Sequence, residues 1–342
     1  MLVRQRTQVN ARIVVALILG LVAFAGIVQP VSAESKTNTA NTLKVSPVRT
    51  DIEVKPGESR TVKVGVTNLT GNDISVRPIT NDFIAGDERG TPALILDPKQ
   101  YAPTHSLKRF MKPIDDVVIP AGKLKLISVV IEVPKNAQSG GYFGAIRFAP
   151  TTPDSGGEVN LSASVASLIL MTVPGPVTEK LSLTNFDIQQ GGKNGTYFQS
   201  ANDLQLSFRL ESKSNVQVAP FGKISVKQGD KIVYDYDFNS STDAPRDMIL
   251  PDSARRWDVP LKNIGSFGHY TVYATLTYGK SNQTIETSRS FWVIPWIVII
   301  AAVAVVLLFL GIILAIILLI RRRKRRVRMG GGHHGHGGYR RY

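Results

Sequence analysis

The stretch Leu-Gln-Leu-Ser-Phe-Arg-Leu at residues 204–210 decides the fold class of this chain. Its apolar residues alternate with polar ones, the pattern of a β-strand that buries one face and exposes the other to water. The same period of two recurs at residues 61–67, 127–133, 142–148, 232–238 and 270–278. No convincing helical periodicity is found between about residues 43 and 291, so the sequence predicts an all-β region.

Turn-forming residues separate these stretches, for example Pro56-Gly57, Gly140-Gly141 and Gln228-Gly229-Asp230. Such residues supply the fixed or positive φ that a tight turn requires. Short strands spaced by turns are typical of immunoglobulin-like sandwiches of about 100 residues. The region is too long for one such domain. We therefore expect two tandem immunoglobulin-like β-sandwiches, at residues 43–174 and 175–293, with the boundary near Pro174-Gly175-Pro176.

The chain carries no charge from Phe291 to Ile320 and then becomes strongly basic. A helix of about 20 apolar residues crosses the roughly 30 Å hydrocarbon core of a membrane. We predict one transmembrane helix at residues 294–320, with Pro295 early in the helix and Trp296 at the outer headgroups. A basic cytoplasmic tail at residues 321–342, rich in Gly and His, would follow and contact anionic lipid. Its first basic residues are Arg321, Arg322, Arg323, Lys324, Arg325 and Arg326. The alternative is a helix buried in a soluble core.

The N-terminus has the order of a secretory signal: basic residues, an apolar stretch at residues 13–27, and small residues that end at Ala33. We predict a signal peptide at residues 1–33, cleaved after Ala33, and a polar spacer at residues 34–42. An uncleaved signal anchor is the alternative. In either case the sandwiches are exported, and cleavage gives a single-pass plasma-membrane protein with its N-terminus outside and its C-terminus inside.

The charge follows from this topology. The chain has a net charge of +15, but 12 of its 41 basic residues and none of its 26 acidic residues lie in the two flanks. The exported part keeps 29 basic and 26 acidic residues, which argues against nucleic acid as a partner. The absence of cysteine excludes disulfides, thiolate metal sites and cysteine nucleophiles.

No residue set predicts catalysis. The run Asp154-Ser155-Gly156-Gly157 resembles the surroundings of a protease serine, but its only upstream histidine, His105, lacks the context of a catalytic base. The exported histidines His105 and His269 are isolated, and glycines flank the histidines at 333–336, so weak adventitious metal binding is the most that this tail suggests. We expect no enzyme activity, no cofactor and no metal site.

Four side chains are candidates for a ligand surface in the second domain: Arg255, Arg256, Trp257 and Tyr273. Aromatic and hydrogen-bonding side chains on a flat strand face can hold sugars or peptides. The alternative is that they belong to the sandwich core or cover a sheet edge.

Six short motifs resemble the peptidoglycan-binding domain of bacterial WxL-interacting cell-surface proteins. They are Val45–Pro47, Val54–Gly57, Val62–Asn68, Ile119–Gly122, Val133–Lys135 and Gly140–Phe148. The family's layout is also similar, with a signal, two immunoglobulin-like domains, one membrane helix and a basic tail. The resemblance implies that the first domain attaches to the cell wall and the second to another surface protein.

Two hypotheses about function follow. The first is a non-enzymatic surface binding or adhesion protein, anchored in the membrane, that binds cell-wall peptidoglycan, another surface protein, or both. The alternative is a membrane-tethered chaperone or assembly factor that acts on secreted surface subunits by strand addition.

Overall fold

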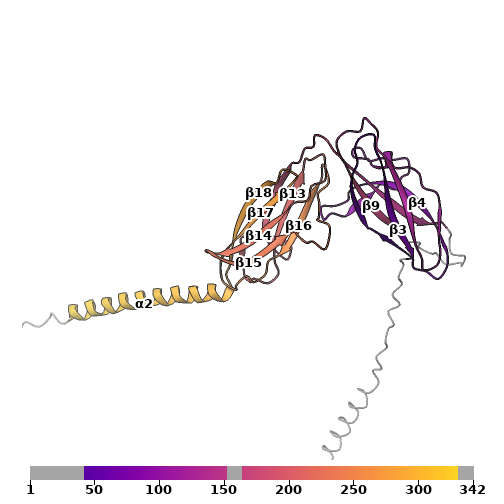
Figure 1. Ribbon diagram of the computed structural model, residues 1–342. Helices are drawn as coiled ribbons and strands as arrows, with labels where there is room; N and C mark the ends of the chain where they lie inside the picture. The colour runs from indigo at the N-terminus through magenta and orange to yellow at the C-terminus, as the bar shows by residue number, and fades with distance from the viewer. Residues whose placement is uncertain (1–41, 152–163, 330–342) are drawn as a thin grey trace, which may run out of the picture. The chain divides into compact units, whose positions relative to one another are not determined.

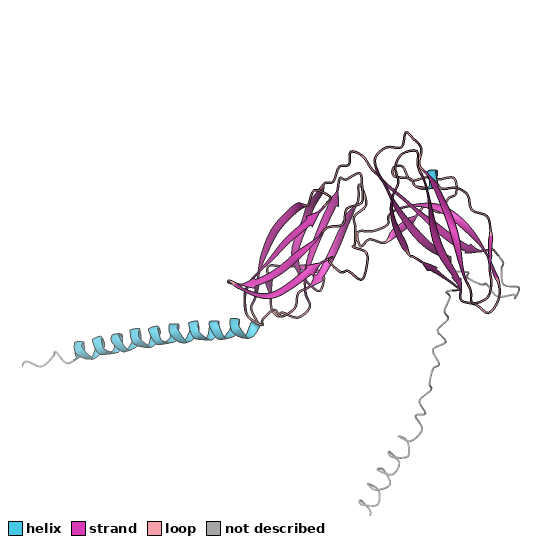
Figure 2. Cartoon of the chain, viewed as in Figure 1, coloured by secondary structure: helices cyan, strands magenta, loops and turns pink. Residues whose placement is uncertain are grey.

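The computed structural model describes residues 42–151 and 164–329. Their strands form two β-sandwiches, and one long helix follows them (Figures 1 and 2). The prediction of two tandem immunoglobulin-like sandwiches and one C-terminal apolar helix is confirmed. The predicted signal peptide with Ala33, nearly all of the spacer, the run Asp154–Gly157 and the end of the tail from residue 330 lie outside the described residues.

The first sandwich consists of two sheets. One sheet has the order β1 (Leu43–Ser46), β3 (Ser59–Asn68) and β7 (Leu124–Glu132). The other has the order β2 (Arg49–Glu53), β9 (Val165–Val173), β8 (Gly140–Pro150), β4 (Ile74–Ala85) and β5 (Pro92–Leu94), with β6 (Val117–Ile119) also paired to β4. All pairs are antiparallel except β2 with β9. The predicted alternation forms the core, because Val62, Val64 and Val66 of β3 and Ile127, Val129 and Ile131 of β7 are buried.

The second sandwich also consists of two sheets. One has the order β11 (Lys193–Asn194), β10 (Leu181–Gln190), β13 (Leu204–Ser212) and β16 (Ala254–Pro260). The other has the order β12 (Tyr197–Phe198), β18 (Gln283–Val293), β17 (Gly268–Tyr278), β14 (Phe221–Gln228) and β15 (Lys231–Phe238). The segment with Pro174, Gly175 and Pro176 connects β9 to β10.

The alternating stretch at residues 204–210 lies in β13, in the middle of its sheet. Its four apolar residues, Leu204, Leu206, Phe208 and Leu210, are all buried. Phe208 packs against Trp257 and Phe238, with ring centroids 5.4 and 5.1 Å apart. Side chains of both sheets therefore meet around this strand, as expected for a sandwich.

The helix α2 runs from Trp296 to Met329. It begins one residue after Pro295, whose carbonyl accepts a hydrogen bond from the Val298 N–H at 3.0 Å. The predicted span began at residue 294 and ended at residue 320, but the structure continues the helix through the basic residues. Within the described residues, α2 is the one helix long and apolar enough to cross a membrane, with a mean hydropathy of 3.5 over its most apolar part. None of the other residues that the structure describes covers that segment.

The burial pattern of β13 gives a direct test of the fold. We expect Leu206→Ala to lower the free energy of unfolding by about 2–5 kcal/mol, because it removes a fully buried side chain and leaves a cavity. The matched control Gln205→Ala changes the neighbouring, half-exposed residue and should cost under about 1 kcal/mol. Denaturant unfolding of the full-length protein in detergent, followed by far-UV circular dichroism, measures both. Equal losses would contradict the assigned inner face of β13.

Candidate functional site

Two of the predicted ligand residues of β16, Arg255 and Arg256, contact the first sandwich. The Arg256 N–H donates to the Glu88 carbonyl at 2.6 Å, and the Glu88 carboxylate accepts two hydrogen bonds from Arg209 at 2.8 and 3.0 Å. Gly90, at φ +90°, lies directly against the Arg255 guanidinium, so a side chain at this position would collide with it. Residues 88–90 thus cover the outer edge of β16.

Arg255 and Trp257 both bind the side chain of Asp247. The Arg255 guanidinium forms an ion pair with the Asp247 carboxylate at 2.9 Å, and Trp257 Nε1 donates to the same carboxylate at 3.2 Å. The Trp257 ring stacks on Phe208 in the core. The structure therefore assigns Trp257 the packing position that the sequence left open as an alternative.

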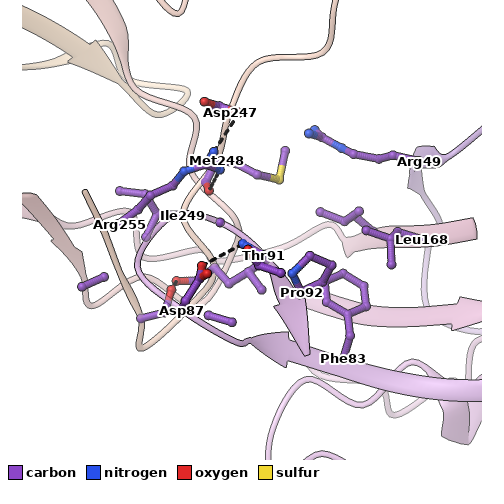
Figure 3. Close-up of a pocket in the computed structure, with 16 residues that line it drawn as sticks. Arg49, Phe83, Asp87, Thr91, Pro92, Leu168, Asp247, Met248, Ile249 and Arg255 are labelled. Carbon is purple, nitrogen blue, oxygen red and sulfur yellow. Dashed lines mark hydrogen bonds and ion pairs between the residues drawn. The ribbon is translucent and has the colours of Figure 1, made fainter. Parts of the chain in front are cut away.

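A small pocket of about 180 Å³ lies beside these contacts, between residues of both sandwiches (Figure 3). Its walls are mostly apolar and include Phe83, Leu168 and Met248. Arg49 also lines it, but its guanidinium is already bonded to the Asp51 carboxylate and the Arg246 carbonyl. The pocket can accept a small apolar group, and it lacks a nucleophile with a histidine base.

Tyr273 lies apart from these residues, on the outer face of the other sheet of the second sandwich. Its ring is partly exposed, and the Lys227 ammonium lies 5.1 Å from the ring centre. Its cross-strand neighbours are Ser225 and Ser288, which makes the surrounding face polar. The structure does not bring Tyr273 together with Arg255, Arg256 and Trp257, so the four do not form one surface.

The free edge of β7 is a feature that the sequence analysis missed. Hydrogen bonds at both ends of the β3–β7 pair, Asn68 N–H to Lys123 O and Val133 N–H to Glu58 O, establish which residues of β7 bond to β3. In an antiparallel pair, alternate residues direct both backbone groups to the same neighbour. The odd-numbered residues of β7 therefore bond to β3, and the even-numbered ones point away from it.

Within the described residues, only some of the backbone groups of β7 that point away from β3 have a hydrogen-bond partner. The Lys112 N–H donates to the Val130 carbonyl at 2.9 Å, near the end of β7. For Leu124, Leu126 and Ser128 the described residues supply no backbone partner. A five-residue stretch of β7 is thus open to another strand.

Two exposed leucines lie on the open part of β7. The exposed fractions of Leu124 and Leu126 are 60% and 62%, although both are apolar. They pack over Gly65 of β3, where an added Cβ would come within 2.9 Å of Leu124 Cδ1. The signal in the sequence was the continued alternation of Leu124 and Leu126 ahead of Ile127, on the opposite face from the core.

The two histidines of the described residues, His105 and His269, each lie against another group of the fold. Within the described residues, no group of three or more His, Asp or Glu side chains could hold a metal ion. The His105 ring shares a 2.6 Å hydrogen bond with the Gly141 carbonyl. His269 lies beside Trp292, with ring centroids 4.7 Å apart.

Comparisons with models of known protein families and with curated proteins gave no match. Among solved structures, the chain is similar to one described as a chaperone–tip adhesin complex vital for activation of CFA/I fimbriae biogenesis. The identity is 15%, the match covers 75% of this chain and 100% of that one, and the TM-score is 0.36. The class 5 fimbriae chaperone CfaA is 15% identical, and the match covers 73% of this chain and 98% of that one with a TM-score of 0.36. The Pseudomonas aeruginosa CupB2 chaperone is 7% identical, and the match covers 72% of this chain and 100% of that one with a TM-score of 0.33. Because these TM-scores are below 0.5, the function proposed below rests on the geometry of this chain alone.

The Glu88–Arg209 contact makes a prediction about pH. The hydrogen bonds from Arg209 hold the pKa of Glu88 below its ordinary value. A carboxyl group whose pKa is lowered in the folded state stabilises that state when the pH is above the group's pKa in the unfolded chain, near 4.3. This stabilisation is lost as the pH falls through the lower pKa of the folded state.

We therefore expect Glu88→Gln to destabilise the protein at pH 7 by at most about 1 kcal/mol, since the pair is largely exposed. The difference from the wild type should disappear in acid, below the lowered pKa. Thermal unfolding of both proteins from pH 7 to pH 2 measures this difference. A difference that stays constant over this range would contradict the role given to the ion pair.

Proposed function

We propose that this chain is a non-enzymatic, membrane-anchored surface protein that binds an extended segment of another exported protein by strand addition to β7. In this mode, the backbone of the incoming segment continues the ladder of a sheet, and its alternate side chains contact the surface of that sheet. The observation that carries the proposal is the open stretch of β7 beside Leu124 and Leu126.

The edge has the groups that strand addition needs. Leu124, Leu126 and Ser128 each direct one N–H and one C=O away from β3, so an incoming strand could form up to six hydrogen bonds there. Unpaired edges of this kind readily accept another chain. The two leucines add apolar surface, at about 25 cal/mol for each Å² that a partner covers.

The charges around this edge favour an acidic partner. Lys44 and Lys63 lie on the outer face of the same sheet, and Lys123 and Lys125 flank or belong to the open stretch. Within the described residues, the lysines that form ion pairs are Lys112, Lys213, Lys223 and Lys280, and none of these belongs to the group of four. An extended segment that alternates apolar and acidic residues fits both the leucines and the lysines.

The apolar helix gives the binding site its location. A span through the plasma membrane, with the basic residues inside, would hold both sandwiches at the outer surface, where exported subunits emerge. We propose that the protein holds or assembles such subunits there.

A second candidate is attachment to cell-wall peptidoglycan, as the resemblance to WxL-interacting proteins implies. It is favoured by one observation, the partly exposed Tyr273 ring on a polar sheet face with Lys227 beside it. Aromatic rings surrounded by hydrogen-bonding groups are suited to sugar rings.

Strand addition is tested by Ser128→Pro, which removes an outward N–H without touching a bond to β3. The probe is a synthetic ten-residue peptide in which valine and glutamate alternate, and the full-length protein is held in lipid nanodiscs. We expect Ser128→Pro to weaken binding by about tenfold or more, through the lost hydrogen bond and steric hindrance of the incoming strand.

The matched control Ser128→Ala keeps the N–H and should bind like the wild type. A peptide with lysine in place of glutamate should bind more weakly, because of the lysines around the edge. Equal binding by both variants would rule out the β7 edge as the site.

Glycan binding is tested by co-sedimentation of the full-length protein, in detergent, with purified cell-wall sacculi. If the Tyr273 face binds glycan, Tyr273→Ala should reduce the sedimented fraction several-fold, and Tyr273→Phe should retain most of it because the ring remains. Sedimentation no greater than that of an unrelated immunoglobulin-like protein would remove this candidate.

A further inference from the structure

Exposed aromatic side chains gather at the end of the second sandwich from which α2 departs. Tyr197, Phe267 and Trp292 have exposed fractions of 43%, 54% and 47%, although large aromatic side chains usually bury most of their surface. Trp296 follows as the first residue of α2 and is exposed as well. We call Tyr197, Phe267 and Trp292 the aromatic rim.

The strand register puts the rim residues side by side. Trp292 of β18 is paired with Tyr197 of β12 on one side and with His269 of β17 on the other. Phe267 directly precedes Gly268, the first residue of β17. Three strand ends therefore present their aromatic side chains at the same end of the sheet.

Hydrogen bonds hold the rim in place. The Trp292 N–H donates to the Thr196 carbonyl at 2.8 Å, and Tyr270 Oη donates to the Phe267 carbonyl at 3.2 Å. Phe198, next to Tyr197, is buried and packs against Phe291, with ring centroids 6.0 Å apart. The rim belongs to the folded sandwich and is not a loose loop.

The connection to the helix is short and is itself bonded to the sandwich. Ile294 and Pro295 are the only residues between β18 and α2. The Ile294 N–H donates to the Phe198 carbonyl, and the Ile294 carbonyl accepts a hydrogen bond from Tyr197 Oη, both at 2.9 Å. Four residues of extended chain span at most about 14 Å, so Trp292 lies within that distance of Trp296.

We infer that the aromatic rim is embedded in the headgroup layer of the membrane that α2 crosses, so that the second sandwich is docked on the lipid surface. The headgroup layer on each side is about 5–8 Å thick, and Trp and Tyr are enriched there because their rings are apolar and their N–H or O–H groups need polar partners. A rim fixed within about 14 Å of the helix start is in reach of that layer.

The charged residues at the end of the second sandwich that carries the rim indicate which lipids it can bind. This end carries Lys193, Lys231 and Lys262 against Asp203 and Asp230, so its net charge is small. The rim should therefore bind zwitterionic as well as anionic lipid. This inference rests on the membrane span of the proposed function but not on strand addition to β7.

The chain has three tryptophans, at 257, 292 and 296, which makes the test direct. Full-length variants with one tryptophan each, the other two replaced by phenylalanine, are placed in phosphatidylcholine vesicles that contain brominated lipid. Bromine quenches tryptophan fluorescence only at short range. Trp296 reports the span, Trp292 the rim, and Trp257, which packs on Phe208, serves as the control.

We expect Trp292 to be quenched at least half as strongly as Trp296 and several-fold more than Trp257, with shallow bromines acting better than deep ones. If Trp296 is quenched and Trp292 behaves like Trp257, the rim does not enter the membrane and the inference is wrong. If Trp296 is not quenched either, the membrane span itself fails, and docking fails with it.

Phe267→Ser in the variant that retains only Trp292 provides a second measurement. The backbone bonds of Phe267 remain, but the rim loses its most exposed aromatic side chain, so quenching of Trp292 should fall. The matched control is Tyr273→Ser, which removes an aromatic ring of similar exposure from the outer face of the same sheet. Equal effects of the two substitutions would contradict a contribution specific to the rim.

Discussion

Backbone hydrogen bonding at the sheet edges is the constraint on which the rest of this structure depends. A strand at an edge has unpaired N–H and C=O groups, and a protein must cover them, expose them to water or pair them with another chain. In the second sandwich, the Arg256 N–H of the edge strand β16 donates to the Glu88 carbonyl of the first sandwich, and β12 pairs with the end of β18, whereas β15 has no further strand beside it within the described residues. In the first sandwich, as far as the described residues go, the Lys112 N–H pairs with only one end of the β7 edge. The open edge of the first sandwich, on which the proposed strand addition relies, follows from this incomplete closure.

The contact between the sandwiches depends more on apolar packing than on charge. An exposed ion pair such as Glu88–Arg209 contributes about 0–1 kcal/mol, whereas burying one large apolar side chain contributes about 1.5–3 kcal/mol. Phe83, Phe143 and Leu170 of the first sandwich are buried in one cluster with Met248 and Leu250 of the second packed against it. Arg255 and Arg256 belong to this contact, which gives the two arginines beside Trp257 a structural role.

The sequence was sufficient to predict those elements that a local residue pattern specifies. The alternation at Leu204–Leu210 identified a strand and its inner face, and the uncharged stretch before Arg321 identified the apolar helix. It was insufficient for Arg255, Arg256 and Trp257, because the pattern of their own strand does not indicate their partners: Glu88 and Phe208 are far away in the chain, and Asp247 precedes the strand in an irregular segment. The sequence also did not indicate that Leu124 and Leu126 lie at an open sheet edge. Strand periodicity predicts which face a side chain is on, but not whether another strand pairs with the edge.

A free edge also raises the question of why copies of this protein would not pair with one another. Two β7 edges brought together would join two sheets that each carry Lys63 and Lys125, and like charges on one continuous sheet repel each other. An acidic segment would form attractive contacts with the same lysines. In the proposed strand addition, these lysines would oppose self-association and favour an acidic foreign strand, so discrimination would arise from repulsion as much as from attraction. In that binding mode, the leucines and the open backbone groups would supply affinity to any strand, and the surrounding charge would determine which strand binds.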